Sequence, residues 1–94
     1  MKKKLEIGEV VTSSALAEAI NGNVDVKQDV YFALERFRRC DWGVSEPESR
    51  DLNDNAVKYN NNRIMAMYPT CEGDIFITTD QDRSHTTMIF CKEY

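Results

Sequence analysis

Residues 63–90 read RIMAMYPTCEGDIFITTDQDRSHTTMIF, and this stretch decides the fold. Over 63–68, 75–79 and 86–90 the apolar and β-branched residues follow the two-residue period of half-buried strands. The intervening segments, Glu72-Gly73-Asp74 and Gln81-Asp82-Arg83, contain the residue types that form tight turns. The stretch therefore predicts a C-terminal three-stranded antiparallel meander.

Helical patterns precede this meander. A short helix is expected over 15–20, because hydroxyl residues that can cap it come before it and Asn21-Gly22-Asn23 follows it. The clearest pattern covers 25–39, where apolar residues recur at steps of three and four and predict one buried stripe. Its apolar members are Val26, Val30, Ala33, Leu34 and Phe37.

A third helix is predicted from a capping box in which Ser45 is the N-cap and Glu48 lies at the third helical position. It is expected to end near Tyr59 and to bury Leu52 and Ala56, with either Tyr59 or Val57, on one side.

These patterns predict an α+β fold in which residues 1–94 form a single domain. Two to three N-terminal helices pack on a C-terminal three-stranded antiparallel β-meander, and an extended pattern over 5–11 leaves room for an extra N-terminal strand. The helices are expected to cover one face of the sheet, so the other face is free for solvent or a ligand.

Composition excludes several classes of function. A net charge of −4 argues against direct nucleic-acid binding through phosphate neutralisation. The three cysteines contain no C-x-x-C pair, and there is one histidine, so neither a disulfide framework nor a metal site is predicted. With no signal-peptide pattern and no apolar run that could cross a bilayer, the chain is expected to be a reduced, soluble protein of the host cell cytoplasm without a membrane partner.

Catalysis is not expected. Ser84 and His85 have the residue types of a nucleophile and a base, but neighbours on a strand point to opposite faces and should not meet. No glycine-rich phosphate loop or zinc signature occurs in the sequence. We therefore predict that the protein is not an enzyme, that it has no catalytic residues, and that it uses no cofactor.

A binding surface is predicted around the last turn, where a guanidinium and several hydroxyls suit phosphate or ribose oxygens. An arginine and a tyrosine from the first strand of the meander would assist, the tyrosine by stacking on a base. The alternative is structural: the threonines are strand formers, and Arg83 pairs with Asp80 or Asp82. The candidate ligand-binding residues are Arg83, Ser84, Thr86, Thr87, Arg63 and Tyr68.

Large apolar side chains outnumber the places that a small core offers. Trp42 is expected in the core, its indole N–H bonded to a carbonyl, although it is also a candidate for stacking on a base. An exposed apolar patch for self-association or a partner is expected, and with it a homodimer or higher assembly. The residues that cannot all be buried are Tyr31, Phe32, Met65, Met67 and Phe76.

The chain also resembles a known family. The order of Asp41-Trp42-Gly43, Arg63-Ile64, Asp82-Arg83-Ser84 with Thr86-Thr87, and Glu93-Tyr94 is similar to that of short accessory proteins carried by phages, plasmids and integrated elements of Gram-positive bacteria. The resemblance implies a gene of a mobile element, and such genes often act against host immunity.

Two functions follow as expectations. The favoured one is a non-enzymatic counter-defence protein that sequesters a nucleotide-type immune signal, in a site between subunits. The alternative is a protein-binding inhibitor of a host defence nuclease, of the anti-CRISPR or anti-restriction type, whose acidic third helix meets a basic groove. The acidic residues of that helix are Glu46, Glu48, Asp51 and Asp54.

Overall fold

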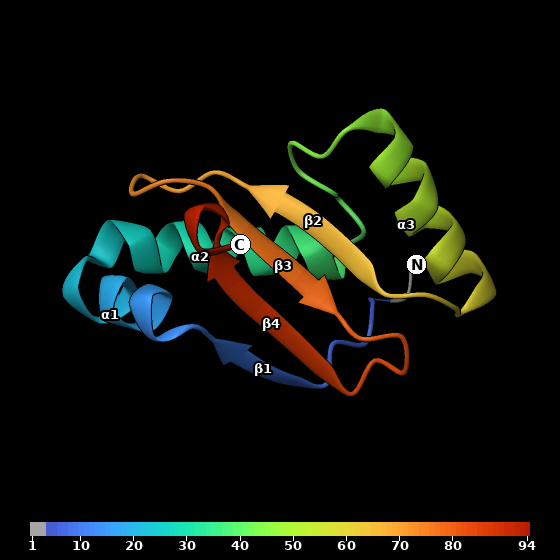
Figure 1. The fold of residues 1–94 in the computed structure, drawn as a ribbon, viewed down its shortest axis with the longest axis horizontal. Coiled ribbons are helices and arrows are strands. Elements are labelled where there is room, and N and C mark those ends of the chain that lie inside the picture. The colour runs from blue at the N-terminus through green and yellow to red at the C-terminus, as the bar shows by residue number, and fades with distance from the viewer. Residues whose placement is uncertain (1–3) are drawn as a thin grey trace.

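The computed structural model describes residues 4–94, and it confirms the α+β class. Three helices and four strands occur in this range, and the chain closes on a short 3-10 turn over Cys91–Glu93 (Figure 1). In chain order the elements are β1 (Glu9–Thr12), α1 (Ser14–Gly22), α2 (Val24–Arg38), α3 (Pro47–Tyr59), β2 (Ile64–Tyr68), β3 (Ile75–Thr79) and β4 (His85–Phe90).

The strands form one sheet in the order β1-β4-β3-β2. The predicted meander is confirmed, since β2 pairs antiparallel with β3 and β3 antiparallel with β4. The extra N-terminal strand is present too, shorter than the 5–11 pattern, and it lies parallel to β4 at the outer edge. Before it, Gly8 has a φ of +59°, and a Cβ there would lie 2.2 Å from the carbonyl oxygen of Ser84. Only glycine lets the chain pass this close to the turn after β3.

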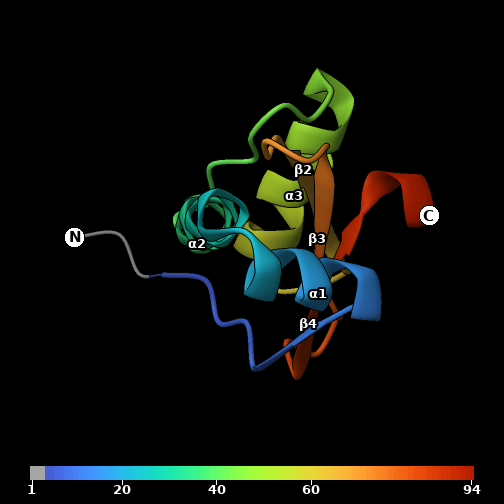
Figure 2. The same ribbon diagram turned by 90° about the vertical axis from the view of Figure 1, so that its left-hand side faces the viewer.

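One face of the sheet is covered by α2, as Figures 1 and 2 show. The helical stripe predicted over 25–39 is buried there, with Val26 and Phe37 fully buried. Opposite the helix, Ile64, Ile75 and Ile77 come from the sheet and are also fully buried. Each such side chain contributes about 1.5–3 kcal/mol by leaving water, so this layer is the core that fixes α2 on the sheet.

The first helix begins as the sequence indicates, and the second is capped by a residue that the sequence places only at the end of the first. Ser13 caps α1 by accepting a hydrogen bond from the N–H of Leu16 at 3.2 Å. Asn23 follows the last residue of α1 and caps α2, accepting from the N–H groups of Asp25 and Val26 at 2.9 and 3.4 Å. One residue therefore joins the two helices.

The capping box predicted for α3 is wrong. The N-cap is Glu46, which makes no side-chain cap bond, and Pro47 is the first helical residue. The hydroxyl of Ser45 instead donates to the carbonyl of Trp42 at 2.6 Å and accepts from the N–H of Met67 at 3.3 Å. Ser45 thus bonds the outer edge of β2 instead of the start of α3, because the chain runs alongside β2 before it enters the helix.

The outer edge of β2 is closed by α3 and the loop before it. The side-chain amide of Asn53 donates to the carbonyl of Met65 at 2.9 Å and accepts from its N–H at 3.3 Å, as a neighbouring strand would. Two residues along, the N–H of Val44 donates to the carbonyl of Met67 at 3.0 Å. Backbone groups that an edge strand would expose are therefore paired.

Replacing Asn53 by aspartate tests this role. The carboxylate keeps the shape of the amide but cannot donate to the carbonyl of Met65, so we expect Asn53→Asp to lower the free energy of unfolding by about 2–3 kcal/mol at neutral pH. Urea denaturation measures it. The matched control is Asn55→Asp, an exposed residue of the same helix. Equal losses in the two variants would show that the amide does not close the edge.

Candidate functional site

Arg83, the centre of the predicted binding surface, is buried in the structure. It is 8% exposed, and its φ of +62° turns the chain between β3 and β4. Its guanidinium donates to the carbonyls of Ala56 at 3.0 Å, Asn61 at 3.4 Å, Asn62 at 2.8 Å and Asp80 at 3.1 Å. The first three lie at or just after the end of α3, where a cation is favoured, although the Ala56 carbonyl also accepts from the N–H groups of Asn60 and Asn61. Arg83 therefore holds the end of α3 on this turn.

Two other predicted ligand-binding residues are part of the core. Thr86 is fully buried, donates through its hydroxyl to the carbonyl of Ile7 at 2.6 Å, and contacts the hydroxyl of Thr79. Tyr68 is fully buried as well, and its hydroxyl donates to the carbonyl of Asp41 at 2.6 Å. Burial raises the pKa of Tyr68 well above its ordinary value. Neither side chain reaches the surface on which a nucleotide would bind.

Ser84 and His85 do meet, contrary to the sequence-based expectation. Ser84 precedes β4 and lies in the turn made by Arg83, so its hydroxyl comes 3.0 Å from Nδ1 of His85. The same hydroxyl donates to the carboxylate of Asp82 at 2.6 Å, and this bond lowers the pKa of Asp82. The carboxylate thus orients the serine and not the imidazole, which is not the arrangement of a catalytic triad.

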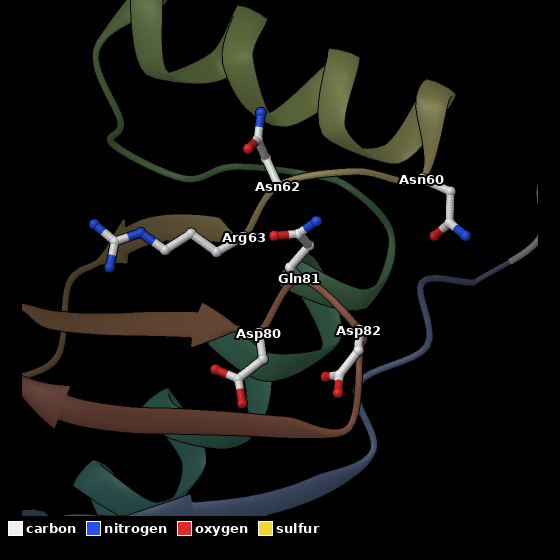
Figure 3. Close-up of a pocket in the computed structure, with 6 residues that line it drawn as sticks. All are labelled: Asn60, Asn62, Arg63, Asp80, Gln81 and Asp82. Carbon is white, nitrogen blue, oxygen red and sulfur yellow. The ribbon is translucent and has the colours of Figure 1, made fainter.

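A polar hollow of about 880 Å³ lies between this turn and the loop after α3. Its side chains do not converge: in Figure 3 Arg63 runs along β2, Asn62 points toward α3, and Asp80 and Asp82 point the opposite way. A phosphate requires several donors aimed at one position, and two carboxylates repel it. The lining residues are Asn60, Asn62, Arg63, Asp80, Gln81 and Asp82. The structure does not bring the six candidate residues into one site.

The sheet face opposite α2 is less covered. Figure 2 shows α2 on one side of the sheet and the C-terminal turn on the other. We call the side chains of this second side the open face, and strand register places them in two rows, Met67-Phe76-Ile89 and Met65-Thr78-Thr87-Val11. The ring of Tyr94 packs on Phe76 at a centroid distance of 5.2 Å.

A charged row borders the open face. Arg63 precedes β2 on this side, while His85 at the start of β4 has its ring nitrogens 3.8 Å from the carboxylates of Glu9 and Asp80. The surface therefore changes from apolar at Met67 to charged at His85. Of the remaining ligand-binding candidates, Arg63 and Thr87 lie on this side, but Arg63 precedes β2 and Thr87 lies on β4.

An apolar groove runs between the open face and α3. It has a volume of about 330 Å³, and its floor contains Met65, Met67 and Phe76. Leu52, expected in the core, forms its wall and is 67% exposed. The buried side of α3 is formed by Asn53 and Ala56 instead, because the amide of Asn53 bonds β2. The helical period wrongly predicted that Leu52 is buried, because it assumes that the apolar side of the helix packs on the core.

Exposed carboxylates accompany this groove. Glu46 lines it, and Glu48 and Asp51 are exposed on the same helix. The carboxylate of Asp54 accepts the indole N–H of Trp42 at 2.7 Å, so Trp42 is buried as predicted but is bonded to a side chain and not to a backbone carbonyl.

The expected apolar patch is two separate surfaces. Met65, Met67 and Phe76 are half-buried on the open face, whereas Tyr31 and Phe32 are each 63% exposed on α2. The two α2 rings contact each other edge to face at 6.1 Å. Because α2 covers the opposite face of the sheet, the two surfaces cannot contact one flat partner together (Figure 2).

No protein-family model, curated protein or solved structure matches the chain. Among residues 4–94, no cluster of histidine, cysteine and carboxylate side chains is suited to hold a metal ion. None of the described helices has both the length and the apolar character that crossing a membrane requires.

The role of Arg83 predicts a large effect on stability. Lysine keeps the charge but has one nitrogen in place of the planar fork, so Arg83→Lys should break most of the four bonds, including those to the carbonyls of Asn61 and Asn62 after α3, and lower the free energy of unfolding by about 2–4 kcal/mol. Arg63→Lys, at an exposed arginine, is the control and should change it by less than about 0.5 kcal/mol. Guanidinium denaturation measures both. A stable Arg83→Lys variant would mean that the four bonds contribute little.

Proposed function

We propose that this protein is a non-catalytic protein-binding module that docks a partner with a basic surface on its open face and α3. The observation that carries the proposal is the apolar groove between Leu52 and Met67, whose lining includes the exposed carboxylate of Glu46. Apolar centres with charged rims are typical of protein interfaces.

The residue types in the groove suit a protein partner. Met65 and Met67 are flexible and fill irregular gaps, and Phe76 offers a large apolar surface. Leu52 projects from α3 with two-thirds of its surface exposed, which provides an anchor that a partner's pocket can enclose. An interaction that buries these side chains removes apolar surface from water at about 25 cal/mol per Å².

The charges favour a basic partner. Glu46, the N-cap of α3, lines the groove opposite one cation, Arg63, and Glu48 and Asp51 add exposed carboxylates on α3 to a chain whose net charge is −4. Carboxylates at the rim of an interface accelerate association with a positively charged surface and reject acidic proteins. A nucleic-acid-binding groove of an enzyme is a surface of this kind.

Sequestration of a nucleotide has less support. It assigns phosphate and ribose to Arg83, Ser84, Thr86 and Thr87, but the polar atoms of Arg83 and Thr86 are bonded to the protein's own carbonyls. Ser84, Thr87 and Arg63 remain exposed, and Arg63 is the one cation among them, at a hollow where Asp80 and Asp82 also lie. The resemblance to accessory proteins of mobile elements makes a host defence nuclease the candidate partner, and this identification rests on the resemblance alone.

Leu52→Lys tests the docking surface. Because Leu52 is 67% exposed, the variant should fold normally, yet a charge in the centre of the interface should weaken partner binding about tenfold or more. The matched control is Val24→Lys, at a valine of α2 that is 66% exposed and distant from the groove. Partners captured from host lysate by the wild type are purified, and their affinities for the three proteins are measured by calorimetry.

Two further measurements complete the test. Glu46→Gln with Glu48→Gln should slow association with the purified partner and reduce its dependence on salt. In parallel, the wild type is titrated with a panel of cyclic and linear nucleotides. Heat with one nucleotide, together with equal partner affinities for Leu52→Lys and Val24→Lys, would overturn the proposal and restore sequestration.

A further inference from the structure

The two edges of the sheet differ in whether their outward backbone groups are hydrogen-bonded. At β2 the amide of Asn53 and the backbone of Val44 occupy the outward backbone groups of Met65 and Met67. At β1 the outer side faces away from the rest of the molecule, and Figure 1 shows no ribbon beyond it. Natural proteins usually protect such an edge or pair it.

The bonds to β4 define which groups of β1 point outward. The N–H groups of Glu9 and Ser13 donate to the carbonyls of Ser84 and Met88, both at 3.0 Å, so odd-numbered residues of this strand face β4. The N–H and C=O groups of Val10 and Thr12 therefore point to the free edge. Within the part of the chain that the structure describes, no other segment bonds them.

From this edge we infer that two copies of the chain pair antiparallel through β1, giving one continuous sheet. With Val10 opposite Thr12 of the second copy, both residues exchange N–H···O bonds in each of two symmetric pairs. The same register sets Val11 directly opposite its own copy, at a position without backbone bonds, where the side chains of an antiparallel pair lie closest.

The side chains support this register. Val11 is on the open face and 40% exposed, so contact with its copy removes apolar surface that the single chain leaves in water. Glu9 comes opposite Ser13 of the second copy, so no like charges face each other. Val10 packs on the core side in both copies. Sliding the strands by two residues would bring Glu9 opposite Val11 and remove the apolar pair.

The symmetry has a consequence for binding. A two-fold axis perpendicular to the sheet places both open faces on one side of the dimer and both α2 helices on the other. The two apolar grooves then face the same direction, so the dimer presents two copies of the docking surface to a partner. This assembly does not depend on what that partner is.

Substitution of Val11 by charged residues tests the pairing. Sedimentation velocity of the full chain, up to about 1 mM, should show a monomer–dimer equilibrium. Val11→Lys and Val11→Glu each place like charges in the closest pair, so each should weaken the dimer about tenfold or more, and an equimolar mixture of the two should associate again. Val24→Lys, the same change at an exposed valine of α2, should behave as the wild type.

The mixture separates the proposed interface from simple misfolding, because a misfolded variant is not rescued by the opposite charge. Wild-type protein that stays monomeric over the whole concentration range would refute the inference. So would a dimer that persists in both Val11 variants, since its interface would then lie elsewhere.

Discussion

The hydrogen bonds of one buried guanidinium, that of Arg83, fix the position of α3 beside the groove. Arg83 reaches the last carbonyl groups of α3 from a turn that is more than twenty residues further along the chain. This fixes the C-terminal end of the helix against the β3–β4 turn, while Asn53 fixes its middle against β2. As a result Leu52 lies beside the open face, and the groove is bounded by α3 as well as by the sheet.

The same bonds explain why the polar turn is a poor ligand site. A guanidinium that already donates to carbonyls cannot also receive a phosphate without leaving them unpaired in a buried place. Two of the exposed polar groups of the turn, on Ser84 and Asp82, bond each other. By contrast, Met65, Met67 and Phe76 on the open face are only half-buried, with Tyr94 packed on Phe76, so this face offers apolar surface to a partner.

The sequence predicted elements whose evidence is local. The period of α2, the meander and the cap at Ser13 depend on neighbouring residues, and the structure confirms them. Apart from the local contact of Ser84 with His85, the failures are tertiary. Ser45 has the residue type and spacing of an N-cap, but its hydroxyl accepts a hydrogen bond from the edge strand β2 instead. Arg83 has the chemistry of an anion site, and nothing adjacent in sequence reveals that its acceptors lie at the end of a distant helix.

Asn23 has a mechanical consequence. Because Asn23 is both the C-cap of α1 and the N-cap of α2, the connection between the helices is a single residue and cannot change its length. Ser13 holds the other end of α1 to β4, and Gly8 passes against the turn before the strand starts. The segment from 8 to 23 is therefore fixed at several points, and an inserted residue would break one of these contacts. Natural or engineered changes in length should be tolerated instead at the exposed bend between β2 and β3.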